Sequence, residues 1–186
     1  MAPKVKITKD DIIDAAMGLV RTEGERAIGA RALASALNCS TQPIFSNFES
    51  MEELKLAVVK KADELCGEYI QREIEGGLYP AYKASGMAYI RFAKEEKELF
   101  KLLYMRDRTG EDPSLDSPIT AKMEDFVQSN TGLCSADAKL FHLEIWACVH
   151  GIAAMFATSF IDLEWELVSK MITDTYMGLK KQYGVE

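Results

Sequence analysis

Apolar residues recur along most of the chain at intervals of three and four, the spacing of amphipathic helices. Breaks rich in Gly, Pro and Asp separate the apolar stretches, and nothing in the pattern argues for strands. We therefore predict an all-α fold of about nine helices. Four are expected over about 9–23, 28–37, 41–47 and 51–75, and five more over about 80–94, 99–105, 119–131, 135–159 and 162–181.

Several residues mark where these helices begin and end. Thr8 with Asp11 three residues later forms a weak capping box for the first helix, and Gly24 ends it. Ser135 can cap the helix that follows it. The polar, breaker-rich stretch 106–118 is expected to be a loop and is the part of the chain most prone to disorder.

The pair of short helices on either side of Asn38 is the most informative feature. Pro43 lacks an N–H and fits only the first turn of a helix, so the second helix should begin at Thr41 with Ser40 as its cap. Asn38 lies where the chain turns sharply, and asparagine tolerates a left-handed backbone better than most residues. Two short helices joined this way are typical of a helix-turn-helix DNA-binding motif. The alternative is a small polar surface helix in an ordinary bundle.

The second short helix carries polar side chains that suit DNA. Gln42 and Asn47 can pair with adenine edges, and Thr41 can donate to bases or phosphates. The amino end of the helix also favours a phosphate. The residues predicted to bind DNA are Arg31, Ser40, Thr41, Gln42, Pro43, Phe45, Ser46, Asn47 and Lys55.

The net charge of −7 argues at first sight against a nucleic-acid partner, but the acidic surplus is unevenly distributed. Residues 1–61 hold nine Lys or Arg against eight Asp or Glu, whereas residues 62–186 hold thirteen against twenty-one. The region of the predicted motif is therefore close to neutral, which permits DNA binding without proving it.

The remaining bulk properties suit a cytoplasmic protein without a membrane partner. No apolar run approaches the roughly 18 residues that cross a bilayer, and the first residues lack the apolar stretch of a signal peptide. The four cysteines have no CxxC spacing, which is typical of reduced cytosolic cysteines. A redox-sensing pair is the alternative.

Enzyme chemistry finds little support. A di-iron site in a helical bundle needs Glu-x-x-His twice, but Lys139 and Ala147 stand three residues before the two histidines, His142 and His150. Cys148 and His150 are two apart and do not face one another on a helix. Neither a phosphate loop nor a nucleophile elbow is present. We predict no enzyme, no cofactor and no metal site.

The chain resembles the TetR (tetracycline-repressor-like) family of bacterial transcription regulators. The resemblance rests, in order and spacing, on Ile12-Ile13-Asp14-Ala15-Ala16, Gly24, Arg31-Ala32-Leu33-Ala34, the stretch Ser40 to Phe48, and Glu52-Glu53-Leu54. A shorter match, Trp146-Ala147-Cys148-Val149-His150-Gly151, resembles the Trp-x-x-x-His-Gly element of one TetR subgroup.

The resemblance implies a homodimer with two domains in each subunit. Residues 1–50 would form the helix-turn-helix domain, whose third helix lies in the major groove of double-stranded DNA. Residues 51–186 would form a ligand-binding and dimerisation domain. In this family, a small-molecule effector usually moves the DNA-binding domains apart and releases a palindromic operator.

The chain departs from the family pattern at four positions. Gly29 stands where Ser or Thr is usual, Phe45 where Tyr is frequent, and Met51 where a lysine commonly touches the DNA backbone. Asn38 replaces the usual turn glycine. Because phosphate contacts supply much of the affinity, we expect a weaker or more salt-sensitive DNA binder.

The second domain is rich in Phe, Tyr, Met and Trp, and the resemblance implies a mostly apolar ligand pocket there. Plain core packing is the alternative for each aromatic, as is a satisfied structural role for His150. The residues predicted to line the pocket are Tyr89, Phe92, Phe126, Phe141, Trp146, His150 and Met155. The dimer interface is expected where the last helix meets a stripe of small residues, Ala147, Gly151, Ala154 and Thr158.

The predicted function is a ligand-responsive transcription regulator. By the habit of the family it would be a repressor, released from its operator by a small apolar molecule. The alternative is a helical ligand-binding or protein-interaction module whose DNA binding is weak or lost. The missing phosphate contacts and the acidic second domain favour that alternative.

Overall fold

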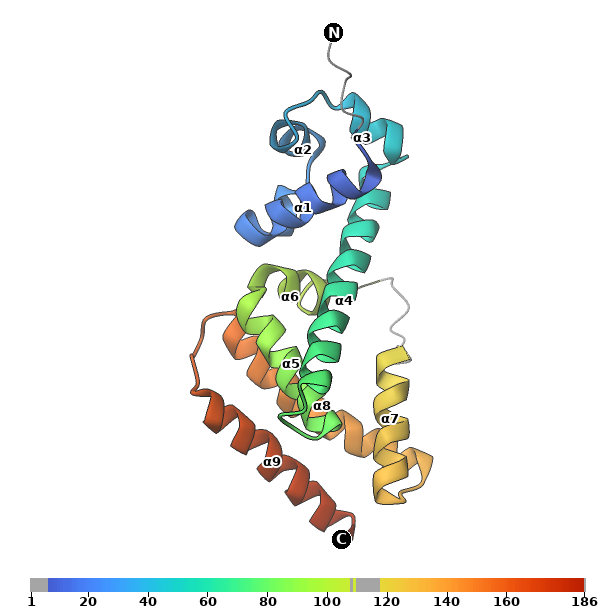
Figure 1. Cartoon of the computed structure of the whole chain (residues 1–186), viewed down its shortest axis with the longest axis vertical. Coiled ribbons are helices and arrows are strands. Elements are labelled where there is room, and N and C mark those ends of the chain that lie inside the picture. The colour runs from blue at the N-terminus through green and yellow to red at the C-terminus, as the bar shows by residue number, and fades with distance from the viewer. Residues whose placement is uncertain (1–6, 108, 110–117, 186) are drawn as a thin grey trace. The chain divides into compact units, whose positions relative to one another are not determined.

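Figure 1 shows the computed structural model of the chain, which describes residues 7–107, 109 and 118–185. Within these residues the fold has nine α-helices, one 3-10 turn and no strand. The predicted all-α class is therefore confirmed. The prediction for the first six residues and most of the loop predicted over 106–118 fall outside the described residues.

The chain forms two compact units. The first comprises Met1–Gly67 and Glu96–Arg106, and the second comprises Glu68–Glu95 and Asp107–Glu186. Helix α4 (Met51–Gly76) contributes residues to both units. The functional boundary expected near residue 50 stays a prediction.

The first unit is built around α1 (Lys9–Glu23), whose start shows the expected capping box. Thr8 Oγ1 accepts from Asp11 N at 3.1 Å, and Thr8 N donates to Asp11 Oδ2 at 2.8 Å. Gly24 ends the helix with a φ of 81°, which few residues other than glycine adopt. The other elements are the 3-10 turn η1 (Glu25–Ala27), α2 (Ala30–Ala36), α3 (Gln42–Asn47), the start of α4, and α6 (Lys97–Tyr104).

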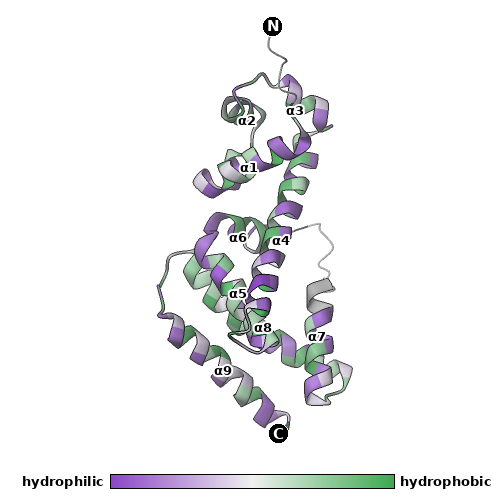
Figure 2. Cartoon of the chain, viewed as in Figure 1, coloured by the Kyte–Doolittle hydropathy of each residue, from purple (hydrophilic) through white to green (hydrophobic). Residues whose placement is uncertain are grey.

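The second unit packs helix on helix. It contains α5 (Ala81–Glu95), α7 (Pro118–Thr131), α8 (Ser135–Ala157) and α9 (Trp165–Gln182). Helix α8 lies against α5, α7 and α9. Gly86 lets α5 and α8 approach closely, because a Cβ atom there would lie 3.3 Å from Val149 Cγ2. Figure 2 shows hydrophobic and hydrophilic residues mixed along α9, as expected of an amphipathic helix.

Helix α8 corrects one expectation from the sequence. With 23 residues, it is the one helix among the described residues that is long and apolar enough to cross a membrane. Nine of its residues are buried in the fold, among them Phe141, Ile145 and Ile152. Its role as the central packing helix of the second unit accounts for this composition.

Three predicted helix starts are also corrected. Ser135 is the first residue of α8, and Cys134 occupies the cap position without a side-chain cap bond. Helix α9 begins at Trp165 rather than Asp162, whose carboxylate instead accepts from Lys94 Nζ at 2.6 Å. Helix α2 begins at Ala30 rather than at residue 28, because the 3-10 turn occupies the preceding segment.

Candidate functional site

Helices α2 and α3 pack together through a tight turn. Asn38 has a φ of 50°, as the sequence predicted for this turn. Cys39 N donates to Ala34 O at 2.8 Å, which closes the end of α2. The shared core consists of Leu33, Ala34, Ile44 and Phe48, all buried. The two helices are thus fixed to each other by a few apolar contacts and one left-handed residue.

The start of α3 differs by one residue from the prediction. The helix begins at Gln42, Thr41 occupies the cap position, and Pro43 lies in the first turn as expected. Ser40 is exposed and does not cap the helix, since Thr41 itself has an αR backbone and makes no side-chain cap bond. The amide groups at this amino end therefore lack a side-chain cap.

The exposed side of α3 carries three of the nine residues predicted to contact DNA. Gln42, Phe45 and Ser46 are exposed, and the Phe45 ring is 54% accessible. Ser46 Oγ donates to Gln42 O at 2.8 Å, so its hydroxyl is engaged with its own helix. Of the other predicted contacts, Arg31 and Ser40 are exposed, whereas Thr41, Pro43 and Lys55 are half-buried.

Asn47 lies differently from the other predicted DNA contacts. It is half-buried at the end of α3, and its Nδ2 lies 2.7 Å from Pro43 O and 3.4 Å from Ile7 O. The amide is therefore engaged with the backbone of the first turn of α3 and with that of the residue before the cap of α1.

Two of the residues that depart from the TetR-like pattern lie at the starts of helices. Gly29 is the cap residue of α2, where it makes no side-chain cap bond and has open space around its Cα. Met51 is the first residue of α4 and is half-buried. Neither position therefore supplies a polar group at the end of its helix.

The second unit brings three predicted ligand-site residues together. Tyr89 Oη and His150 Nδ1 are 3.0 Å apart, and the Trp146 ring stacks on His150 with 4.9 Å between ring centroids. Burial lowers the pKa of His150, which favours the neutral imidazole at neutral pH. The trio thus offers an aromatic surface with a hydrogen-bonding group beside it.

The other four predicted pocket residues make different contacts. Phe92 is fully buried and packs edge-on against Tyr69, and Phe141 is fully buried beside Tyr176. Phe126 stacks on Tyr82, with 5.4 Å between centroids. Met155 is half-buried. Tyr82 and Tyr176, with 6.0 Å between ring centroids, join the Phe126 and Phe141 contacts into one aromatic group.

Sequence reasoning missed a second Tyr–His pair. Tyr82 Oη and His142 Nδ1 lie 2.9 Å apart and link α5 to α8, as do Tyr89 and His150. In each pair the tyrosine and the histidine are about sixty residues apart in the chain, and no local motif links them. The seven-residue spacing of the tyrosines and the eight-residue spacing of the histidines were the available signals.

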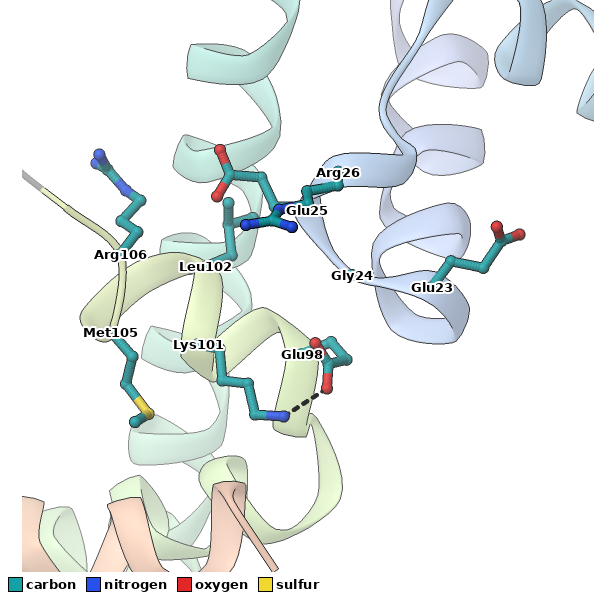
Figure 3. Close-up of a pocket in the computed structure, with 9 residues that line it drawn as sticks. All are labelled: Glu23, Gly24, Glu25, Arg26, Glu98, Lys101, Leu102, Met105 and Arg106. Carbon is teal, nitrogen blue, oxygen red and sulfur yellow. Dashed lines mark hydrogen bonds and ion pairs between the residues drawn. The ribbon is translucent and has the colours of Figure 1, made fainter.

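The first unit also contains an unpredicted pocket of about 420 Å³, between the end of α1 and α6. Lys101 Nζ lies 2.6 Å from Glu98 Oε1. Figure 3 shows Glu23 pointing away from this ion pair. Arg26 and Arg106 add positive charge to the lining. The lining thus combines charged groups of both signs with the apolar side chains of Leu102 and Met105.

Comparison with known proteins bears on the family. Residues 82–172 match the family model described as tetracyclin repressor-like, C-terminal domain. A TetR-like transcriptional regulator from Rhodococcus sp. RHA1 shares the fold with a TM-score of 0.70 and 14% sequence identity, over 99% of this chain and 100% of that chain. No curated protein matches the sequence. Residues 82–172 therefore resemble the C-terminal domain of tetracyclin repressor-like proteins, and the whole chain has the fold of a TetR-like transcriptional regulator.

Proposed function

We propose that this protein is a ligand-responsive regulator that binds a palindromic DNA operator through α3. One observation carries the proposal: α3 rests on buried Ile44 and Phe48 while Gln42 and Phe45 are exposed on it. A short helix supported from behind, with polar and aromatic side chains in solvent, meets the requirement for insertion in a major groove.

The individual contacts follow from side-chain chemistry. Gln42 would pair with a base edge, most favourably adenine, and Phe45 would pack against the sugar-phosphate backbone or a thymine methyl group. Arg31 and Lys55 supply positive charge for phosphates near α3. With few such contacts, binding should be weak at physiological salt.

We propose a homodimer formed through α8 and α9. Leu140 and Trp146 on α8, and Leu167 and Met177 on α9, are large apolar residues that the single chain leaves exposed. Exposed apolar groups on neighbouring helices favour an interface between copies. A two-fold pair would present two α3 helices to the two halves of a palindrome.

The effector would bind in the second unit, in a cytoplasmic protein. Tyr89, Trp146 and His150 suit a small, largely apolar molecule with one polar group that reaches the imidazole. We propose that binding releases the operator, which makes the protein a repressor. The alternative, a ligand-binding module without DNA binding, keeps support from the acidic second unit.

Selection of bound duplexes from a random pool tests the proposal. We expect enrichment of a palindrome whose half-sites lie about one helical turn or slightly more apart. The control is a Gln42→Ala, Phe45→Ala double variant, which should enrich nothing comparable. If the wild-type protein enriches no sequence even at low salt, the alternative module is favoured instead.

A further inference from the structure

We infer that Asn47 and Lys9 are positioning residues, which hold the carboxyl end of α3 to the start of α1 instead of contacting DNA. The inference rests on the proposed function. It gives Asn47 a role different from the adenine contact that its residue type suggested.

Helix α3 needs such support because it is short. It has six residues, and helices of that length are unstable by themselves in water. Its first backbone bonds, from Ile44 N and Phe45 N to Thr41 O, are 3.2 Å and 3.4 Å long. The direction in which α3 points must therefore be set by contacts with the rest of the unit.

The amide of Asn47 provides the first of these contacts. Its nitrogen faces two carbonyl oxygens, Pro43 O at 2.7 Å and Ile7 O at 3.4 Å. Carbonyl oxygens only accept hydrogen bonds, so both N–H groups of the amide are committed to them. Bidentate pairing with adenine requires an amide donor and an acceptor together. Asn47 could read a base in this way only by giving up its hold on the backbone.

Lys9 provides the second contact, through Glu53 at the start of α4. Lys9 Nζ lies 3.0 Å from Glu53 Oε1 and 4.8 Å from the centroid of the Phe48 ring. The other carboxylate oxygen of Glu53 accepts from Glu49 N at 2.6 Å. The Glu49 bond first, and then Lys9, lower the pKa of Glu53, so the bridge is ionised at neutral pH.

The two contacts converge on residues 47–49, immediately after the recognition surface. Ile7 lies just before Thr8, the cap of α1, Lys9 is the first residue of α1, and Glu53 belongs to α4. We name this set, Asn47, Lys9 and Glu53, the α3 clamp. Loss of the clamp should misdirect every contact of α3 at once, since binding groups must be held to about half an ångström.

A positioning residue and a base-reading residue give different signatures in DNA selection. For Asn47→Asp, which keeps the shape but loses both N–H donors, we expect the wild-type sequence preference with affinity weaker by about tenfold. For Gln42→Ala, we expect relaxed preference at one base pair in each half-site. Asn130 Nδ2 donates to Phe126 O at 2.7 Å in the second unit, so Asn130→Asp is the matched control and should leave DNA affinity unchanged.

Salt titrations test Lys9 on the selected duplex. A phosphate contact would lower the slope of log affinity against log salt by about 1 when removed. We expect Lys9→Met, which keeps an aliphatic stem over Phe48, to weaken binding about threefold with an unchanged slope.

Amide hydrogen exchange keeps the inference testable without DNA. In Asn47→Asp and in Lys9→Met, the amides of residues 44–48 should exchange faster than in the wild-type protein. A wild-type protein that enriches no duplex overturns the proposed function, and unchanged exchange at residues 44–48 overturns the clamp. A preference altered at one base pair in Asn47→Asp, or a reduced salt slope in Lys9→Met, also overturns the clamp.

Discussion

The guanidinium of Arg21 binds the carboxylate of Glu96 through two parallel hydrogen bonds, Nε to Oε2 at 2.8 Å and Nη2 to Oε1 at 2.9 Å. Arg21 lies in the last turn of α1, and Glu96 is the single residue between α5 and α6. The pair therefore fastens the end of α1 to the start of α6 within the first compact unit.

Removing this pair should destabilise the first unit measurably. Exposed ion pairs are usually worth about 0.2–1 kcal/mol, and the parallel geometry should place Arg21→Ala near the upper end of that range. Urea unfolding of Arg21→Ala and Arg21→Lys measures the loss. The matched control is Asp174→Asn, which breaks a more exposed pair with Lys170 and should cost less than about 0.5 kcal/mol. An equal cost in both variants would contradict the assigned role.

Two glycines inside helices should respond differently to alanine. Gly18 in α1 has open space around its Cα, so Gly18→Ala should stabilise the protein by about 0.5–1 kcal/mol through helix propensity alone. At Gly86 the same gain is offset, because the new methyl group would lie 3.3 Å from Val149 Cγ2. Thermal unfolding of the two variants compares them, and a higher midpoint for Gly86→Ala than for Gly18→Ala would be inconsistent with the close α5–α8 contact.

The burial of His142 predicts how the stability of the fold changes with pH. Burial lowers the pKa of His142 below its ordinary value of 6.5, so the unfolded chain binds a proton more readily than the folded one. The contribution of neutral His142 is therefore complete above about pH 6.5 and is lost as the pH falls towards the folded-state pKa. Denaturant midpoints measured between pH 7.5 and pH 5 should fall on acidification, and less steeply in His142→Gln. A midpoint that rises on acidification would contradict the burial of this imidazole.

The missing phosphate contacts can be restored by substitution. Gly29→Ser would add a hydroxyl at the start of α2, and Met51→Lys would add a charge at the start of α4. We expect each to increase operator affinity several-fold, and Met51→Lys to raise the salt slope by about 1. Titration of a selected duplex at fixed salt provides the measurement. No gain from either substitution would mean that these positions lie away from the DNA backbone.

The sequence predicted the elements that depend on local signals. The Thr8 capping box, the stop at Gly24 and the left-handed turn at Asn38 all have a cause within four residues, and all are present. The start of α3 was displaced by one residue because Pro43 is tolerated at either of the first two helical positions. Such boundaries depend on small energy differences that neighbouring contacts decide.

The same local signals could not predict contacts between distant parts of the chain. Tyr82 and His142 are sixty residues apart, and the helical period shows only that each residue faces inward. Asn47 looked like an ordinary exposed recognition residue until its amide was seen to face Pro43 O and Ile7 O. Composition identified the aromatic second unit, but could not distinguish packed rings such as Phe141 from the partly exposed Trp146.

Site-specific photo-cross-linking tests the central claim, that the exposed side of α3 lies against DNA. A photoreactive amino acid at position 42 should cross-link to the selected duplex within the half-site, while the same amino acid at position 78, between α4 and α5 and also exposed, should not. Cross-linking from position 42 to the bases of each half-site is the predicted result. Specific binding of the duplex with cross-links from position 78 and none from position 42 would contradict the account.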